Sequence, residues 1–197
     1  MKVFCILYFS ILFSSLSYTQ TLYTRSAHVN VQSNNSVKNI EADNYQVNSL
    51  IDLATKTIKF EGLLKSFEFK LGSLDRAFHS DRVKLNKYPK IRFEGTISGL
   101  EQINLDGFNE YPVTVDGTLY IWDEKRKTSA TGTVTTIGDG LQVFASSGFT
   151  MTIEENSMNK LNQLVEEKVP LGISASSFGV SRDILILLDA TYKVKNK

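Results

Sequence analysis

Histidine, cysteine and paired carboxylates are the side chains through which this chain could bind a metal or catalyse a reaction. The sequence contains two histidines, His28 and His79, and a single cysteine, Cys5. Neither histidine has a Cys, His, Asp or Glu neighbour at the spacing of a zinc site, so no metal site is predicted. A catalytic triad needs three groups that converge in space, and we expect the histidines to serve as surface or helix-end residues instead.

Other catalytic motifs are missing from the sequence. The stretch "GISAS" at 172–176 lacks the second glycine of a nucleophile elbow, and phosphate loops and dinucleotide fingerprints are absent. The pairs Glu154-Glu155 and Glu166-Glu167 are adjacent residues, whose side chains point in different directions on a helix or strand. We therefore predict no catalytic residue, no metal and no cofactor.

The first twenty residues have the pattern of a secretory signal peptide. Lys2 precedes an apolar run, Val3 to Phe13, and a region of small residues follows. Ser15 and Ser17 have the small-x-small spacing of a cleavage site, so we expect cleavage near Ser17 to Gln20. The run is shorter than the ~20 residues of a membrane-spanning helix, so we expect no stable membrane insertion; an uncleaved anchor is the alternative. Cys5 lies inside this segment. The mature protein, 21–197, is then a periplasmic or secreted domain without disulfides, which needs a large core.

The charges of the chain are balanced. There are 22 Lys and Arg residues against 21 Asp and Glu, and no basic cluster is longer than Lys125 to Lys127. A nucleic-acid interface needs a clustered basic face, so we expect no nucleic-acid partner. A homodimer is left open.

Period-two alternation of apolar and polar residues dominates the mature chain and predicts strands rather than helices. Asp106-Gly107 and Gly138-Asp139-Gly140 are turn signals that supply positive φ angles. So many closely spaced strands favour an antiparallel sheet that closes into a barrel, which removes the sheet edges. The predicted strands are 27–33, 45–54, 57–64, 66–72, 90–97, 111–122, 129–137, 141–153 and 184–194.

Two segments predict short helices that cap the barrel. Residues 73–85 begin with Ser73 as a plausible N-cap and place Leu74 and Phe78 on one face. Residues 154–168 place Met158, Leu161, Leu164 and Val165 on one stripe, and Pro170 ends that segment.

Several strands have one apolar face, and these faces predict a wholly apolar barrel interior. Two interpretations stay open: an ordinary filled core, or a cavity for an apolar ligand. Glycines on inward faces favour the cavity, because each leaves room where a side chain would pack. These glycines are Gly62, Gly95, Gly117 and Gly132.

The stretch from Ser66 to Ile97 resembles the YceI-like proteins, which are secreted or periplasmic lipid-binding proteins of bacteria. The shared features are a Ser-Phe-x-Phe strand, a short helix containing Phe, a Lys-Tyr-Pro step and a Phe-x-Gly strand. A later Val-x-Gly-x-Leu-x-Ile strand is also similar, and the match runs from about Val47 to Phe149. The residues concerned are Ser66, Phe67, Phe69, Phe78, Lys87, Tyr88, Pro89, Phe93, Gly95, Val115, Gly117, Leu119 and Ile121.

This resemblance implies an all-β, elongated, lipocalin-like antiparallel barrel of about eight strands. Its pore would hold a polyisoprenoid, an isoprenoid quinone or a fatty amide for sequestration or transport. We expect Phe78 and the stripe from Met158 to Val165 to cover a mouth. The residues expected to bind the ligand are Phe67, Phe69, Phe78, Phe93, Ile97, Val115, Leu119, Phe149, Met151, Ile186 and Leu188.

The sequence also departs from the family pattern. Ala77 replaces a histidine before the helix phenylalanine, Trp122-Asp123 replaces a His-Gly pair, and segment 154–183 is longer than usual. These changes leave the lipid and its head-group contacts open. The alternative functions are a small secreted enzyme acting on a lipid, which needs polar groups inside the barrel, and a ligand-free structural or interaction barrel.

Overall fold

The computed structural model describes residues 20–34, 39–80, 85–122, 124–152 and 183–196. The predicted signal peptide up to residue 19 and the predicted helix at 154–168 lie outside these residues. So do the stripe from Met158 to Val165 and most of the long segment before the last strand.

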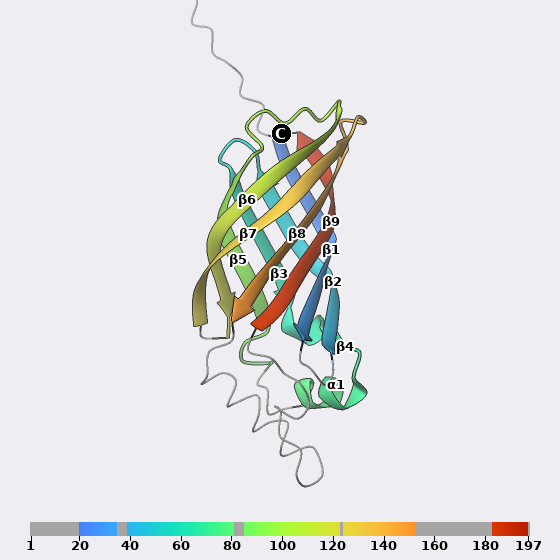
Figure 1. Cartoon of the computed structure of the whole chain (residues 1–197), viewed down its shortest axis with the longest axis vertical. Helices are drawn as coiled ribbons and strands as arrows, with labels where there is room; N and C mark the ends of the chain where they lie inside the picture. The colour runs from blue at the N-terminus through green and yellow to red at the C-terminus, as the bar shows by residue number, and fades with distance from the viewer. Residues whose placement is uncertain (1–19, 35–38, 81–84, 123, 153–182, 197) are drawn as a thin grey trace, which may run out of the picture.

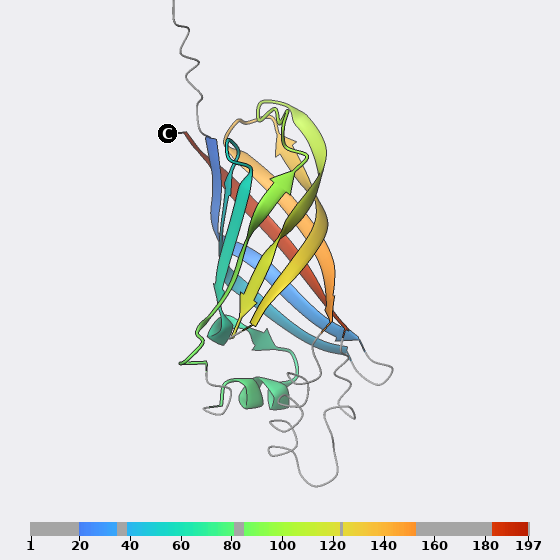
Figure 2. The same ribbon diagram turned by 90° about the vertical axis from the view of Figure 1, so that its left-hand side faces the viewer.

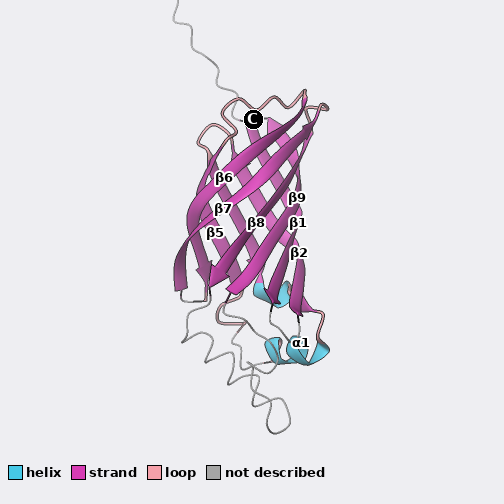
Figure 3. Cartoon of the chain, in the orientation of Figure 1, coloured by secondary structure: helices cyan, strands magenta, loops and turns pink. Residues whose placement is uncertain are grey.

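Eight long strands form one closed antiparallel barrel (Figures 1 and 3). Around the barrel the order is β1, β9, β8, β7, β6, β5, β3 and β2, and β1 pairs with β2 to close the ring. The all-β barrel predicted from the sequence is confirmed. The strands are β1 (Gln20–Asn34), β2 (Asn39–Asp52), β3 (Thr57–Leu63), β5 (Lys90–Ser98), β6 (Phe108–Ile121), β7 (Glu124–Ile137), β8 (Gln142–Thr152) and β9 (Asp183–Asn196).

Strand β1 is irregular where it closes the barrel. Its register with β2 shifts between Thr24 and Ala27 and again between Ala27 and Val29, and its pairing with β9 shifts between Tyr23 and His28. Such bulges bend a strand and increase its twist, which helps a sheet to curl into a ring. The view turned by 90° shows the strongly tilted strands that result (Figure 2).

The connections at one end of the barrel contain short turns whose geometry matches their residues. Gly138 and Gly140 have φ angles of 74° and 65°, and the Asp139 carboxylate accepts two backbone amides after the turn, so that prediction is confirmed. The prediction for Gly107 is wrong, because its φ is not positive. Lys56 and Trp122 instead adopt positive φ angles of 53° and 52° without being glycine.

Between β3 and β5 the chain crosses the opposite end of the barrel (Figure 2). A 3-10 helix, η1 (Leu64–Ser66), leads to a two-residue strand, β4 (Glu68–Phe69), and to helix α1 (Gly72–Phe78). The strand predicted at 66–72 is therefore wrong except for β4, which pairs with Ala42 and Asp43 of β2. The backbone here finds other partners: Leu64 N donates to Pro89 O at 2.8 Å.

Helix α1 is shorter than predicted. It begins at Gly72, so Ser73 lies inside its first turn rather than at the N-cap. Leu74 is buried, and Phe78 is half-buried and packs against the core, so the predicted apolar face is confirmed.

Candidate functional site

The inward faces of the strands form the lumen, by which we mean the interior of the barrel. A narrow cavity of about 30 Å³ lies in it, and every side chain that lines this cavity is apolar. This volume holds one or two water molecules, so the lumen is nearly filled in this structure. The lining residues are Val29, Val31, Val47, Phe60, Phe67, Ile91, Leu119, Phe149, Ile186 and Leu188.

Half of the cavity lining was predicted from the sequence. Phe67, Leu119, Phe149, Ile186 and Leu188 belong to the expected set, and the structure brings them together. The other five lining residues were missed, although each lies in or beside a predicted strand on its apolar face. The alternation of Val29 with Val31 was a signal available in the sequence.

The remaining predicted ligand residues lie elsewhere. Phe93, Ile97 and Val115 are buried in the core but do not line the cavity, and Met151 packs against that core partly buried. Phe69 and Phe78 contact each other beside α1, with ring centroids 5.0 Å apart and planes tilted by 53°.

Phe93 fills the room that two glycines were expected to leave. Gly95 and Gly117 are directly opposite one another on β5 and β6. A Cβ at Gly117 would lie 2.6 Å from Cζ of Phe93, and one at Gly95 would lie 2.9 Å from its Cε1. The Phe93 ring also stacks on Phe60 at 5.2 Å. These glycines therefore accommodate an aromatic ring, and the argument that they favour a cavity is wrong at this position.

Tyr192 and Ser49 form a hydrogen bond across the interior. Their hydroxyl oxygens are 2.8 Å apart, and Ser49 Oγ also donates to the backbone carbonyl of Lys59 at 3.1 Å. Tyr192 is 1% exposed and Ser49 is 4% exposed. Burial raises the pKa of the Tyr192 phenol, and the bond with Ser49 offsets part of that rise.

The interior is not wholly apolar as predicted, because Asn44 and an ion pair also face inward. Asn44 is fully buried; it donates to Leu63 O at 3.0 Å and accepts from Gln46 N at 2.8 Å. Arg126 is directly opposite the inward-facing Leu119, so it shares the inner face. Its guanidinium donates to the Glu124 carboxylate at 2.5 and 3.1 Å, at the α1 end of β7.

A second group of polar residues lies on the outer face of β1 and β2. His28 Nε2 is 2.7 Å from the Asp43 carboxylate, and the His28 ring stacks on Tyr45 at 4.3 Å. Burial opposes ionisation of Asp43, but hydrogen bonds from Asn30 and His28 lower its pKa. His28 is thus hydrogen-bonded to Asp43 on the outer face of the barrel, which agrees with the surface position expected from the sequence.

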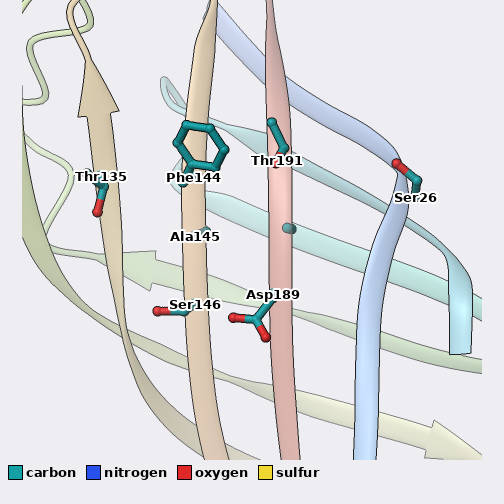
Figure 4. Close-up of a pocket in the computed structure, with 8 residues that line it drawn as sticks. Ser26, Thr135, Phe144, Ala145, Ser146, Asp189 and Thr191 are labelled. Atoms are coloured by element: carbon teal, nitrogen blue, oxygen red, sulfur yellow. The ribbon is translucent and has the colours of Figure 1, made fainter. Parts of the chain in front are cut away.

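The outer face also carries an open pocket of about 280 Å³ over β7, β8, β9 and β1 (Figure 4). Asp189 supplies its one carboxylate, and Phe144 supplies an aromatic ring that is 43% exposed. No histidine or cysteine lines it. Within the described ranges no three His, Cys, Asp or Glu side chains are grouped so that they could hold a metal ion. The remaining lining residues are Ser26, Thr135, Ala145, Ser146, Ala190 and Thr191.

The fold and the lumen define a closed, lipocalin-like antiparallel barrel whose central cavity has an apolar lining and whose inner face also carries a few paired polar side chains. The model of the YceI-like domain matches residues 17–186, and the chain belongs to this family. A search of the curated proteins found no match. Among the described residues, no helix is long and apolar enough to cross a membrane.

Solved structures share the fold at low sequence identity. A polyisoprenoid binding domain from Saccharophagus degradans is 10% identical, with a TM-score of 0.71, and the alignment covers 90% of this chain and 99% of that one. BcnA from Burkholderia cenocepacia is 15% identical, with a TM-score of 0.51 over 86% and 96% of the two chains. A YceI protein from Campylobacter jejuni is 15% identical, with a TM-score of 0.51 over 82% and 85%.

Proposed function

We propose that this protein binds a long apolar lipid, such as a polyisoprenoid, an isoprenoid quinone or a fatty amide, inside its barrel. The observation that carries the proposal is the cavity in the lumen, whose ten lining side chains are all apolar. A polar ligand would find no hydrogen-bond partner on these side chains, and its desolvation would oppose binding. Binding of an apolar chain to the same surface is favourable, because it removes apolar surface from water.

The lipid has to displace side chains, because a cavity of about 30 Å³ is too small for it. Several inward-facing residues of the lining are half-buried, unlike the tightly packed Val47 and Leu119, which are each 1% exposed. Half-buried side chains have fewer neighbours and can change rotamer at lower cost. The half-buried lining residues are Val31, Phe60, Ile91, Phe149 and Leu188.

Family membership and one structural neighbour support the choice of ligand. The neighbour from Saccharophagus degradans is described as a polyisoprenoid binding domain, and it shares the fold over 90% of this chain.

We propose that the lipid is bound without being changed chemically. Polar side chains that face the interior in the described part of the barrel are engaged with the backbone or with one another. Asn44 is bonded to backbone groups, Ser49 to Tyr192 and Lys59 O, and Arg126 to Glu124. The signal-like segment at 1–20 supports a site of action in the periplasm or outside the cell.

Native mass spectrometry of the full protein purified without detergent tests the proposal. We expect a co-purifying lipid at about one per chain, or uptake of added polyprenol, quinone or fatty amide to that ratio. A chain that stays bare with all three ligands would refute lipid binding.

Two adjacent positions on β9 provide a matched pair of variants. Leu188 lines the cavity, whereas Leu187 faces outward, and both are half-buried. Leu188→Asn places an amide in the apolar lumen and should weaken lipid binding by about tenfold or more. Leu187→Asn should leave the affinity unchanged. Equal losses in the two variants would mean that the lipid binds outside the lumen.

A further inference from the structure

One row of directly paired residues runs down the inner wall of the barrel and has polar ends. Ser49 is opposite Phe60, Phe60 is opposite Phe93, Phe93 is opposite Leu119, and Leu119 is opposite Arg126. Ser49 lies toward the end of β2, whereas Arg126 lies at the start of β7 near the α1 end (Figure 1). The apolar residues of the row, Phe60, Phe93 and Leu119, therefore lie between Ser49 and Arg126, and Arg126 is the end nearer α1.

The row also gives the depth of the apolar segment. The row crosses four pairs of neighbouring strands. With a strand spacing of about 4.8 Å and a strand tilt of about 40°, Arg126 lies about 12 Å nearer the α1 end than Ser49 along the barrel axis. The apolar segment between Ser49 and Arg126 is thus much shorter than the strands themselves.

The Tyr192 side chain closes this segment at the Ser49 level. It starts on β9, lies across β1 and reaches Ser49 on β2, since β1 separates these two strands in the barrel. Because Ser49 Oγ donates to Lys59 O, the Tyr192 hydroxyl donates to Ser49. Moving the ring would break a buried hydrogen bond, so Tyr192 resists displacement more than an apolar side chain does.

The interior beyond Tyr192 is packed. Leu22, Ile51 and Val143 are each at most 1% exposed, in contrast to the half-buried side chains around the cavity. An incoming chain therefore meets movable side chains on the α1 side of Tyr192 and a fixed, filled layer on the other side.

We propose that Tyr192, held by Ser49, stops the apolar tail of the ligand and sets the length of tail that the lumen accepts. This inference rests on the proposed lipid binding. The tail lies on the α1 side of the ring, and carbons beyond the capacity of this segment stay outside the lumen and add little to the affinity. Tyr192 is a specificity-determining residue for chain length.

A series of prenyl alcohols tests the inference, with dissociation constants measured by competition against tritium-labelled farnesol. For the full protein, we expect about tenfold tighter binding from geraniol to farnesol, and at most about a twofold gain from farnesol to geranylgeraniol. Tyr192→Ala removes the ring that closes the segment, so the affinity should then also rise about tenfold from farnesol to geranylgeraniol. Tyr192→Phe keeps the ring but loses the hydrogen bond to Ser49 that holds it, so from farnesol to geranylgeraniol its binding should tighten by an intermediate factor of about three.

The outcomes separate the two proposals. If no alcohol binds to the wild-type protein, binding of prenyl chains in the lumen is refuted, and the Tyr192 stop with it. If the alcohols bind but the affinity keeps rising through geranylgeraniol, or if Tyr192→Ala has the wild-type profile, Tyr192 is not the stop. Should Tyr192→Ala fail to fold, Tyr192→Leu removes most of the ring and provides the same comparison.

Discussion

Gly117 is the position at which the packing of the barrel makes its sharpest prediction. A Cβ at this residue would lie 2.5 Å from Glu94 O, 2.6 Å from Cζ of Phe93 and 2.7 Å from Cα of Gly95. Two of these three neighbours are backbone atoms of the paired strand, which cannot rotate away. Gly117→Ala must therefore separate β5 from β6 and displace the Phe93 ring.

The size of the effect follows from two opposing contributions. Overpacking of this kind costs about 3 kcal/mol at the upper end of the usual range. Alanine in a strand recovers about 1 kcal/mol, because glycine loses more backbone entropy on folding. We therefore expect the free energy of unfolding to fall by about 2 kcal/mol, which corresponds to a Tm about 4–8 °C lower for a domain of this size.

Urea unfolding followed by far-ultraviolet circular dichroism measures this loss. Gly148→Ala is the matched control, because it lies in a strand on the outer face. Its added Cβ would meet only the flexible Leu187 Cδ2 at 3.1 Å and Ile186 O at 3.9 Å. We expect a change within about 0.5 kcal/mol for the control. Equal stabilities of the two variants would show that β5 and β6 are not held as close as the structure indicates.

Three further predictions concern buried and titrating groups. Asn44→Ala removes a fully buried side chain and leaves Leu63 O and Gln46 N without their partner, so unfolding should require about 2–3 kcal/mol less; a loss below 1 kcal/mol in urea would contradict this. Tyr192→Phe removes one buried hydrogen bond to Ser49, and the same assay should show a loss of about 1 kcal/mol. Partial burial disfavours the charged form of His79, but two backbone carbonyls, which can only accept, raise its pKa above 6.5. Its stabilising effect is complete below pH 6.5 and is lost as the pH rises through the folded-state pKa, so His79→Asn should lower Tm more at about pH 5 than at about pH 8.

The barrel was predictable because strand alternation records which face is buried. Leu119 was placed in the lumen because Val113, Val115, Leu119 and Ile121 alternate with other residues along one strand. Phe67 also lines the cavity, although it lies between η1 and β4 and not in a strand as predicted. The position of a residue along the barrel axis cannot be predicted from this alternation, since it depends on the stagger between strands. Phe93 and Val115 were for this reason assigned to the lining although they pack away from the cavity.

Two polar features of the interior were missed for a different reason. Arg126 was noted only as the middle residue of the basic cluster Lys125 to Lys127, because its inward orientation follows only from its pairing with Leu119. The bond between Tyr192 and Ser49 joins residues that are distant in the sequence, and a single sequence carries no local signal for such a contact.

The seam between β1 and β9 determines when the barrel can close during folding. Gln20 is paired with Asn196, so the first described strand is completed by the last. A contact between such distant parts of the chain requires the closure of a very long loop and forms slowly. Until then both strands expose unpaired edges, which are sites for aggregation. The barrel therefore cannot close before strand β9 is available to pair with β1.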